Sequence, residues 1–222
     1  MIQKNKFFLL IFLFIILTTY SFNEQKQNFN LIFPIKKIII KNAQVVNLVN
    51  LKTDLEFLRD TSLFFLRKKK IIQVLDKYDF ISSIQLKKIF PKTLVILISE
   101  QIPVATEING NKKYYLTKEG VKINYIELKV FESLPSIFGN HKNFSSFYAK
   151  LEKNNFNINA IKGFYYFEAN RWDIKLKDNR IIKLPETNYS KIIAELDLIL
   201  KDSNFSKYKI FDYRIKNQLI LQ

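Results

Sequence analysis

Residues 90–105 read FPKTLVILISEQIPVA, and this stretch decides the fold. The segment Leu94–Ile98 (LVILI) is apolar at every position, which predicts a strand that is central in its sheet and covered. Pro91 and Lys92 form a turn between this strand, Thr93–Glu100, and the preceding strand, Ile81–Phe90. The sequence pattern changes after Pro103, which predicts the start of a second unit there.

The chain before this strand pair alternates between strand and helix patterns. Lys36–Lys41 (KKIIIK) predicts a short strand. Leu51–Arg59 places leucines on one helical face, with Asn50 as the expected N-cap, and Arg67–Asp79 predicts a second amphipathic helix. The order strand, helix, helix, strand, strand predicts a small α+β domain at residues 35–103, with both helices on one face of a three-stranded sheet.

Residues 104–222 predict a second, mostly antiparallel β domain with packed helices. Turn residues stand at Asn109-Gly110, Lys118–Gly120 and Asp178-Asn179. Helical patterns cover 144–153 and 188–201, and strand patterns cover 114–116, 121–125, 161–168, 171–177 and 180–184. The chain is expected to end in one strand from about Tyr208 to Leu221.

The amino-terminal residues predict the cellular compartment in which the rest of the chain lies. Residues 1–6 carry Lys4 and Lys6, and residues 7–22 are mostly apolar. A cleaved signal peptide and an uncleaved signal-anchor helix both fit this pattern. The anchor is favoured because Thr19 and Ser21 make a poor cleavage site, although 7–22 would form only about 24 Å of helix against a bilayer core of about 30 Å. We therefore expect a cytoplasmic tail at 1–6, a transmembrane helix at 7–22, a polar spacer at 23–34 and an exported remainder.

The composition excludes several classes of enzyme. The 222 residues include no cysteine, one histidine (His141) and four glycines. A thiol nucleophile, a disulfide framework and a thiolate metal site are therefore impossible, and no glycine stands in a phosphate-binding motif. We expect no catalytic site, no metal, no cofactor and no small-molecule substrate. An exported enzyme that uses a pair of carboxylates would need two inward-facing acidic side chains with raised pKa values.

The net charge of +16 has two interpretations. It could mark binding to nucleic acid or to anionic lipid, or it could reflect a lysine-rich composition without a specific role. The lysines are spread along the chain, which favours the second interpretation. Export makes nucleic acid an improbable partner. The basic run Arg67–Lys70 is expected to be a solvated face, with contact to anionic headgroups as its alternative.

Five ordered segments resemble the bacterial cell-division family FtsQ, also called DivIB. They are the aromatic-Pro-x-x-Leu turn at 90–94, the E-x-x-P-x-A junction at 100–105, L-P-x-apolar-x-G at 134–139, R-W-polar-apolar-x-L at 171–176 and D-apolar-R at 212–214. Family members have a short cytoplasmic segment, one transmembrane helix, a POTRA domain and a β domain. Here the tail is short, and Asp178-Asn179 stands where glycine is common.

The resemblance implies a non-catalytic scaffold of the division machinery in the inner membrane, concentrated at the septum. Its partners would be the division proteins FtsB and FtsL, bound through their periplasmic ends. A POTRA-type chaperone or assembly module of the envelope is the alternative. The motif residues Pro91, Glu100, Pro103, Arg171 and Trp172 are interpreted as structural: Pro91 forces a turn, Trp172 fills a core, and Glu100 and Pro103 fix the angle between the two domains.

The carboxyl-terminal strand is where we expect partner binding. If it is one strand, Phe211, Tyr213 and Ile215 share one face and Asp212 and Arg214 the other. An apolar strand at a sheet edge is an aggregation hazard unless something covers it, and the resemblance implies that a partner strand does so. Arg214 would then pair with an acidic side chain of the partner. The alternative is that the terminal leucines pack beneath the helix at 188–201. The predicted partner-binding residues are Asp212, Arg214, Ile215, Lys216, Asn217 and Leu219.

Overall fold

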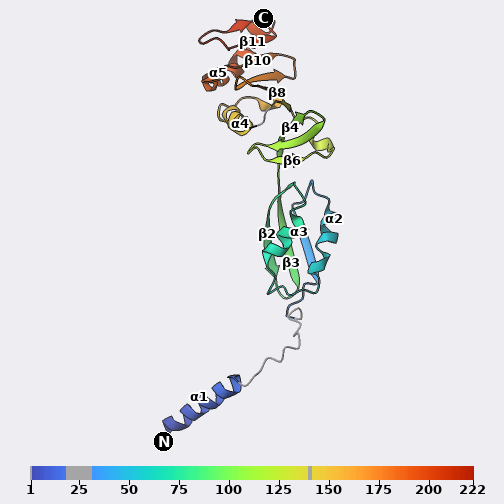
Figure 1. Cartoon of the computed structure of the whole chain (residues 1–222), viewed down its shortest axis with the longest axis vertical. Coiled ribbons are helices and arrows are strands. Elements are labelled where there is room, and N and C mark those ends of the chain that lie inside the picture. Colours follow the sequence, from blue (N-terminus) through green and yellow to red (C-terminus); the bar gives the residue numbers. More distant parts are fainter. Residues whose placement is uncertain (1, 19–31, 140–141) are drawn as a thin grey trace.

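The computed structural model describes residues 2–18, 32–139 and 142–222 (Figure 1). It begins with helix α1, Ile2–Thr18. No helix in the described ranges has both the length and the apolar character needed to cross a membrane. The predicted span 7–22 begins within α1, and its last four residues lie outside the described ranges, as do most of the spacer and His141.

The first folded unit is a three-stranded sheet with helices on one face. Its strands are β1 (Lys37–Lys41), β2 (Ile81–Ile89) and β3 (Thr93–Glu100). They lie in the order β1-β3-β2, with β1 parallel and β2 antiparallel to β3. The helices are α2 (Leu48–Asp54), the 3₁₀ turn η2 (Glu56–Leu58) and α3 (Lys68–Leu75). The predicted element order and the central position of the LVILI strand are therefore confirmed.

Both helices of this unit have boundaries that differ from the prediction. The N-cap of the first helix is Asn47 and not Asn50, because the Asn47 side chain accepts hydrogen bonds from the backbone N–H groups of Val49 and Asn50. Leu55 and Leu58 follow the helix but remain in the core with Leu51. The second helix ends at Leu75, four residues before the predicted end.

The second unit is a nine-stranded sheet. Its strands lie in the order β12-β11-β10-β9-β8-β7-β4-β5-β6. They are β4 (Pro103–Asn109), β5 (Lys112–Thr117), β6 (Lys122–Asn124), β7 (Ser136–Phe138), β8 (Ile161–Phe167), β9 (Arg171–Leu176), β10 (Ile181–Lys183), β11 (Ile210–Asp212) and β12 (Ile220–Leu221). The sheet is mostly antiparallel, as predicted, but β7 pairs in parallel with both β4 and β8, and β10 pairs in parallel with β11.

Two helices pack on this sheet. They are α4 (Phe144–Lys153) and α5 (Tyr189–Lys201), and the short 3₁₀ turns are η3 (Lys129–Phe131), η4 (Ile158–Ala160) and η5 (Ser203–Phe205). Trp172 is 1% exposed and stacks on Phe147 of α4, with ring centroids 4.8 Å apart. Ile193 and Leu196 of α5 are also completely buried in this core. Burial of these large apolar surfaces is the main force that holds the unit together.

The two units meet in a cluster of aromatic side chains. Only Gln101 and Ile102 separate β3 from β4. Phe80 stacks on Phe131 with centroids 6.0 Å apart, and Tyr115 meets the edge of Phe131 at 5.3 Å. Tyr115 belongs to the second sheet but is buried in the core of the first unit. The junction is therefore packed, and the second sheet extends away from the end of the first unit at which the chain enters (Figure 1).

Candidate functional site

The carboxyl-terminal segment folds back on itself, so the single strand predicted from Tyr208 to Leu221 is wrong. The structure has two short antiparallel strands there, β11 and β12, with Phe211 opposite Leu221 and Asp212 opposite Ile220. The reversal takes place in residues 213–219. Asn217 adopts a left-handed conformation (φ 60°), and the Gln218 N–H donates to the Ile215 carbonyl. The predicted alternation of faces through Ile215 fails for the same reason.

This hairpin leaves an open edge. β12 is the outermost strand at its end of the nine-stranded sheet, and among the described residues no strand pairs with its outer side. Ile220 is 37% exposed, whereas Leu219 and Leu221 pack against the core of the second unit. These two leucines therefore pack towards the core of the second unit. The backbone edge itself remains available for strand addition.

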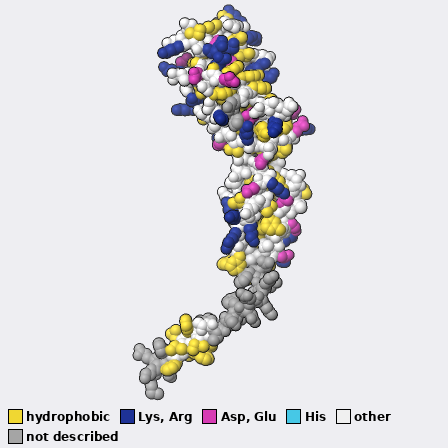
Figure 2. Space-filling model, viewed as in Figure 1, with side chains coloured by type: hydrophobic (Ala, Val, Ile, Leu, Met, Phe, Trp, Pro, Cys, Tyr) yellow, Lys and Arg dark blue, Asp and Glu magenta, His cyan; other side chains and the backbone are white. Residues whose placement is uncertain are grey.

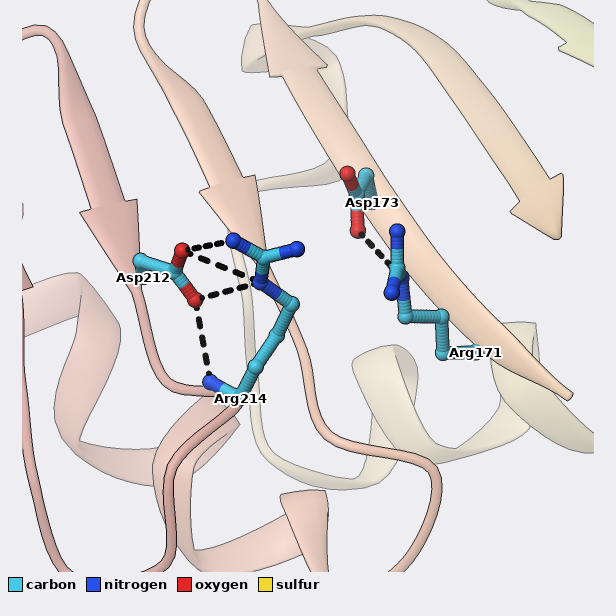
Figure 3. Close-up of polar contacts among 4 residues, drawn as sticks. All are labelled: Arg171, Asp173, Asp212 and Arg214. Carbon is cyan, nitrogen blue, oxygen red and sulfur yellow. Dashed lines mark hydrogen bonds and ion pairs between the residues drawn. The ribbon is translucent and has the colours of Figure 1, made fainter. Parts of the chain in front are cut away.

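Asp212 and Arg214 form a closed pair at the start of the reversal (Figure 3). The Arg214 Nη2 donates to Asp212 Oδ2 at 2.6 Å, its Nε donates to both carboxylate oxygens, and its backbone N–H donates to Oδ1 at 3.1 Å. These hydrogen bonds lower the pKa of Asp212, with the Arg214 side chain as the largest cause. The expected ion pair between Arg214 and a partner is thus already made inside the chain, and Arg214 instead holds the loop that follows.

A groove lies between this loop and the first turns of α5. Its volume is about 850 Å³, and it brings together five of the predicted residues: Arg214, Ile215, Lys216, Asn217 and Leu219. The sixth, Asp212, does not line the groove but holds Arg214. Ile215 is 52% exposed. The segment is therefore one continuous wall, although its backbone is a loop and not a strand.

The opposite wall of the groove was not predicted. It is formed by residues at and before α5: Pro185, Glu186, Thr187, Asn188, Lys191, Ile192 and Glu195. The helical pattern at 188–201 placed Ile192 on an apolar face, and that signal would have indicated a surface beside the terminal segment. The register between the helix and the loop depends on contacts between distant residues, so the sequence alone could not bring the two walls together.

Tyr213 lies between the two walls with an unsatisfied hydroxyl group. The group is buried, and no described residue forms a hydrogen bond with it. Burial raises the pKa of Tyr213 to about 12, and the charge of Glu195 adds to the shift. The hydroxyl therefore stays protonated near neutral pH.

A row of charges crosses the sheet next to this site. Lys183 of β10 lies in register between Asp173 of β9 and Asp212 of β11. Burial raises the pKa of Asp173, while the nearby charges of Arg171, Lys183 and Arg214 oppose the shift. The Arg171 Nε lies 3.7 Å from Asp173 Oδ1, too far for a hydrogen bond (Figure 3). Arg171 also lies over the ring of Phe167, so the Arg-Trp motif contributes one polar and one core residue.

Three motif residues, Pro91, Glu100 and Pro103, belong to the first unit or to its junction with the second. They are distant in sequence from the residues of the groove. Pro91 follows Phe90 through a cis peptide bond in the turn between β2 and β3, and Pro103 opens β4. The Glu100 carboxylate accepts hydrogen bonds from three consecutive backbone N–H groups at residues 44–46, over 2.9–3.1 Å. Its contacts therefore fasten a loop of the first unit.

Comparison with known proteins agrees with this architecture. The family model described as "POTRA domain, FtsQ-type" matches residues 33–101, which include all three strands of the first sheet. The cell division protein FtsQ of Rickettsia typhi is 26% identical over 194 residues, which cover 86% of this chain and 73% of the relative. FtsQ of Rickettsia prowazekii is also 26% identical, over 86% of this chain and 72% of its own.

A more distant relative extends the similarity beyond Rickettsia. FtsQ of Rhizobium radiobacter is 24% identical over 136 residues, or 59% of this chain and 63% of the relative. The matches at 194 residues are too long to be confined to the first unit. The chain therefore carries an FtsQ-type POTRA domain, and its similarity to FtsQ cell division proteins extends into the second sheet.

Proposed function

We propose that this protein is a non-catalytic scaffold of the bacterial division machinery, and that it binds the periplasmic ends of FtsB and FtsL at its carboxyl-terminal edge. The observation that carries the proposal is the open outer side of β12 beside the groove of about 850 Å³. An unpaired strand edge offers main-chain hydrogen bonds, and an adjacent groove offers side-chain contacts. The FtsQ-type POTRA domain and the similarity to FtsQ cell division proteins support a role in division.

The groove suits a partner segment of mixed character. Ile192 and Leu219 supply apolar surface, and Ile215 stands exposed at its side. Glu186 and Glu195 supply negative charge, and Lys191 and Lys216 supply positive charge. A strand that adds to β12 can therefore place one apolar side chain against Ile215 and orient itself by its charges.

The second part of the proposal is a membrane anchor near the amino terminus. Residues 8–16 of α1 are all apolar and exposed, with exposed fractions of 40–69%. We propose that residues 7–22 lie in the inner membrane, with Lys4 and Lys6 on the cytoplasmic side by the positive-inside rule. Residues 35–103 and 104–222 would then be two periplasmic domains, and the protein would gather at the septum with its partners.

The binding site is tested by Ile215→Asp. A synthetic FtsB periplasmic segment, alone and together with that of FtsL, is titrated against the full chain in detergent. We expect the variant to bind at least about 10-fold more weakly, because a charge would be buried at an apolar contact. The matched control is Val130→Asp, which places the same charge at a side chain that is 70% exposed and outside the groove.

Two results would contradict the proposed site. One is unchanged affinity in Ile215→Asp when its circular dichroism matches that of the wild type. The other is an equal loss of affinity in Val130→Asp. Arg214→Glu is a poor test of binding, since it also breaks the pair with Asp212 inside the chain.

A further inference from the structure

One end of the first unit carries a patch of exposed apolar side chains, which we name the aromatic tip. Its members are 43–58% exposed, although all are large and apolar: Ile32, Phe33, Phe64, Phe65, Ile89 and Phe90. They come from three separate segments that the fold brings together. The rings of Phe33 and Phe90 meet edge to face at 5.2 Å, and the Leu63 N–H donates to the Phe33 carbonyl. Exposed apolar patches of this kind mark interaction surfaces.

Basic side chains surround the aromatic tip. The run Arg67–Lys70 is exposed at all four positions and follows the tip segment 64–65 after one residue; Arg67 is the N-cap of α3 and Lys68–Lys70 form its first turn. Lys36 and Lys37 lie beside Lys92, because their backbone N–H groups both donate to its carbonyl. The Lys88 ammonium donates to the Phe64 carbonyl. Figure 2 shows hydrophobic side chains at this end of the unit, with Lys and Arg side chains beside them.

Nearby acidic side chains neutralise only part of this charge. Asp60 forms an ion pair with Lys36, and Glu56 forms one with Arg59. An apolar groove of about 490 Å³ lies between these elements, with Phe57, Phe65 and Leu66 in its walls and Arg67 and Lys70 at its side. An apolar groove bordered by cations suits an amphiphile with a negative headgroup.

The aromatic tip also lies where the chain enters the first unit. Thirteen residues separate α1 from residue 32, and this connection can span at most about 50 Å in any conformation. The tip therefore lies within about 50 Å of the end of α1. The second sheet and its β12 edge lie at the opposite end of the folded part (Figure 1).

We propose that the aromatic tip rests on the anionic surface of the inner membrane, with its phenyl rings at the level of the headgroups and its lysines and arginines against lipid phosphates. The inference depends on the proposed anchor, because α1 brings the tip to that surface. Aromatic rings favour the membrane interface, and clustered basic residues favour anionic lipids. This contact would fix the orientation of the first unit relative to the membrane and keep the β12 edge away from the membrane.

The test uses the fragment 32–222, which lacks α1. Among the described residues, both sheets and both hydrophobic cores are built from positions after 34 and include no residue of α1, so we expect the fragment to fold. It is sedimented with vesicles of phosphatidylcholine alone and with vesicles that contain about 30% phosphatidylglycerol. We expect binding to the anionic vesicles only, with a marked loss when the salt concentration rises.

Two pairs of variants locate the contact. Phe64→Ser and Lys69→Glu should each reduce vesicle binding at least about 5-fold, because they remove an interfacial ring or reverse a charge. The matched controls, Leu198→Ser and Lys118→Glu, change exposed side chains of the second unit and should bind like the wild type. Binding that all four variants retain would overturn the proposal.

Two further outcomes would also overturn it. One is a fragment that does not bind to anionic vesicles. The other is a fragment that self-associates through the tip, seen as a dimer in sedimentation that Phe64→Ser dissociates. The anchor is tested separately by alkaline extraction of membranes that contain the full chain. If the full chain stays in the membrane but the fragment does not bind vesicles, the tip proposal fails and the anchor stands.

Discussion

Asp212 and Arg214 show how two residues organise a whole loop. The Asp212 side chain is 6% exposed and accepts hydrogen bonds from both the backbone and the side chain of Arg214, whose side chain is 41% exposed. A buried carboxylate without a hydrogen-bond partner is costly. The D-apolar-R motif therefore supplies its own counter-ion, and the chain direction after Tyr213 follows from that pairing.

Removal of the guanidinium should destabilise the folded chain. We expect Arg214→Ala to lower the free energy of unfolding by about 1 kcal/mol, less than for a fully buried pair because Arg214 is partly solvated. Urea denaturation of fragment 32–222 measures this, with Lys216→Ala as the control at an exposed neighbour. The effect should depend on pH. A carboxyl group with a lowered pKa stabilises the fold above its unfolded pKa of about 3.9, and this contribution disappears as the pH falls through the folded value.

The difference between the wild type and Arg214→Ala should therefore narrow below about pH 4. A difference that stays constant from neutral pH to about pH 2 would show that the Asp212 charge is not its origin. A loss of stability in Lys216→Ala equal to that in Arg214→Ala would likewise argue against a specific pair.

At the scale of elements, Glu100 connects the end of β3 to the loop that leads into α2. Its two carboxylate oxygens accept from the N–H groups of Gln44, Val45 and Val46. These N–H groups precede the Asn47 N-cap and lie outside regular structure, so they need an acceptor. One side chain at the last position of a strand thus sets the entry of a helix more than forty residues earlier in the chain.

Glu100→Ala should loosen that loop without unfolding the second sheet. We expect a loss of about 1–3 kcal/mol, since three backbone donors lose a charged acceptor. Hydrogen exchange of the amides of residues 44–46 should become at least about 10-fold faster, while exchange in β8 and β9 stays unchanged. Glu119→Ala, which removes an exposed carboxylate in a turn, is the control. Unchanged exchange at 44–46 would mean that the loop is held by its other contacts.

At the scale of the whole molecule, the aromatic junction joins the two units. Phe80 comes from the first unit, whereas Tyr115 and Phe131 come from the second. The side chain of Asn124 also donates to Asp79 across the same boundary. A connection of only two residues together with a packed aromatic cluster favours one fixed angle between the units.

Phe131→Ala should allow the angle between the two units to vary. We expect a loss of about 1–2 kcal/mol, since Phe131 is only partly buried, and a broader range of inter-unit distances. The chain contains no cysteine, so Lys52→Cys and Lys118→Cys provide unique sites for two spin labels. Pulsed electron paramagnetic resonance then measures the distribution of distances between the two labels, with Val130→Ala as the neighbouring control. An equally narrow distribution in Phe131→Ala would show that the short connection alone sets the angle.

The sequence alone predicted part of the candidate site, just as it predicted part of the fold. Five residues of the terminal segment do line one groove, because a short segment stays together whatever its backbone does. The helix wall with Ile192 and Glu195 was missed, and so was the internal partner of Arg214. Both features depend on the reversal of the chain between β11 and β12. The alternating residue pattern of this segment did not predict that reversal. The apolar pattern of 208–221 favoured one strand, whereas the Asp212–Arg214 pair and the turn at Asn217 favour a hairpin.

The sequence by itself determined the order of the elements, the central LVILI strand and the hairpin turns at Gly110, Gly120 and Asn179, since periodicity and turn-forming residues act locally. Only the tertiary structure decided where the first helix begins, which strand forms the free edge and how the two units are joined. Those features rest on contacts such as Glu100 with residues 44–46 and Phe80 with Phe131, between positions far apart in the chain. Local sequence patterns do not specify such contacts, because the surfaces that meet are formed only when the chain folds.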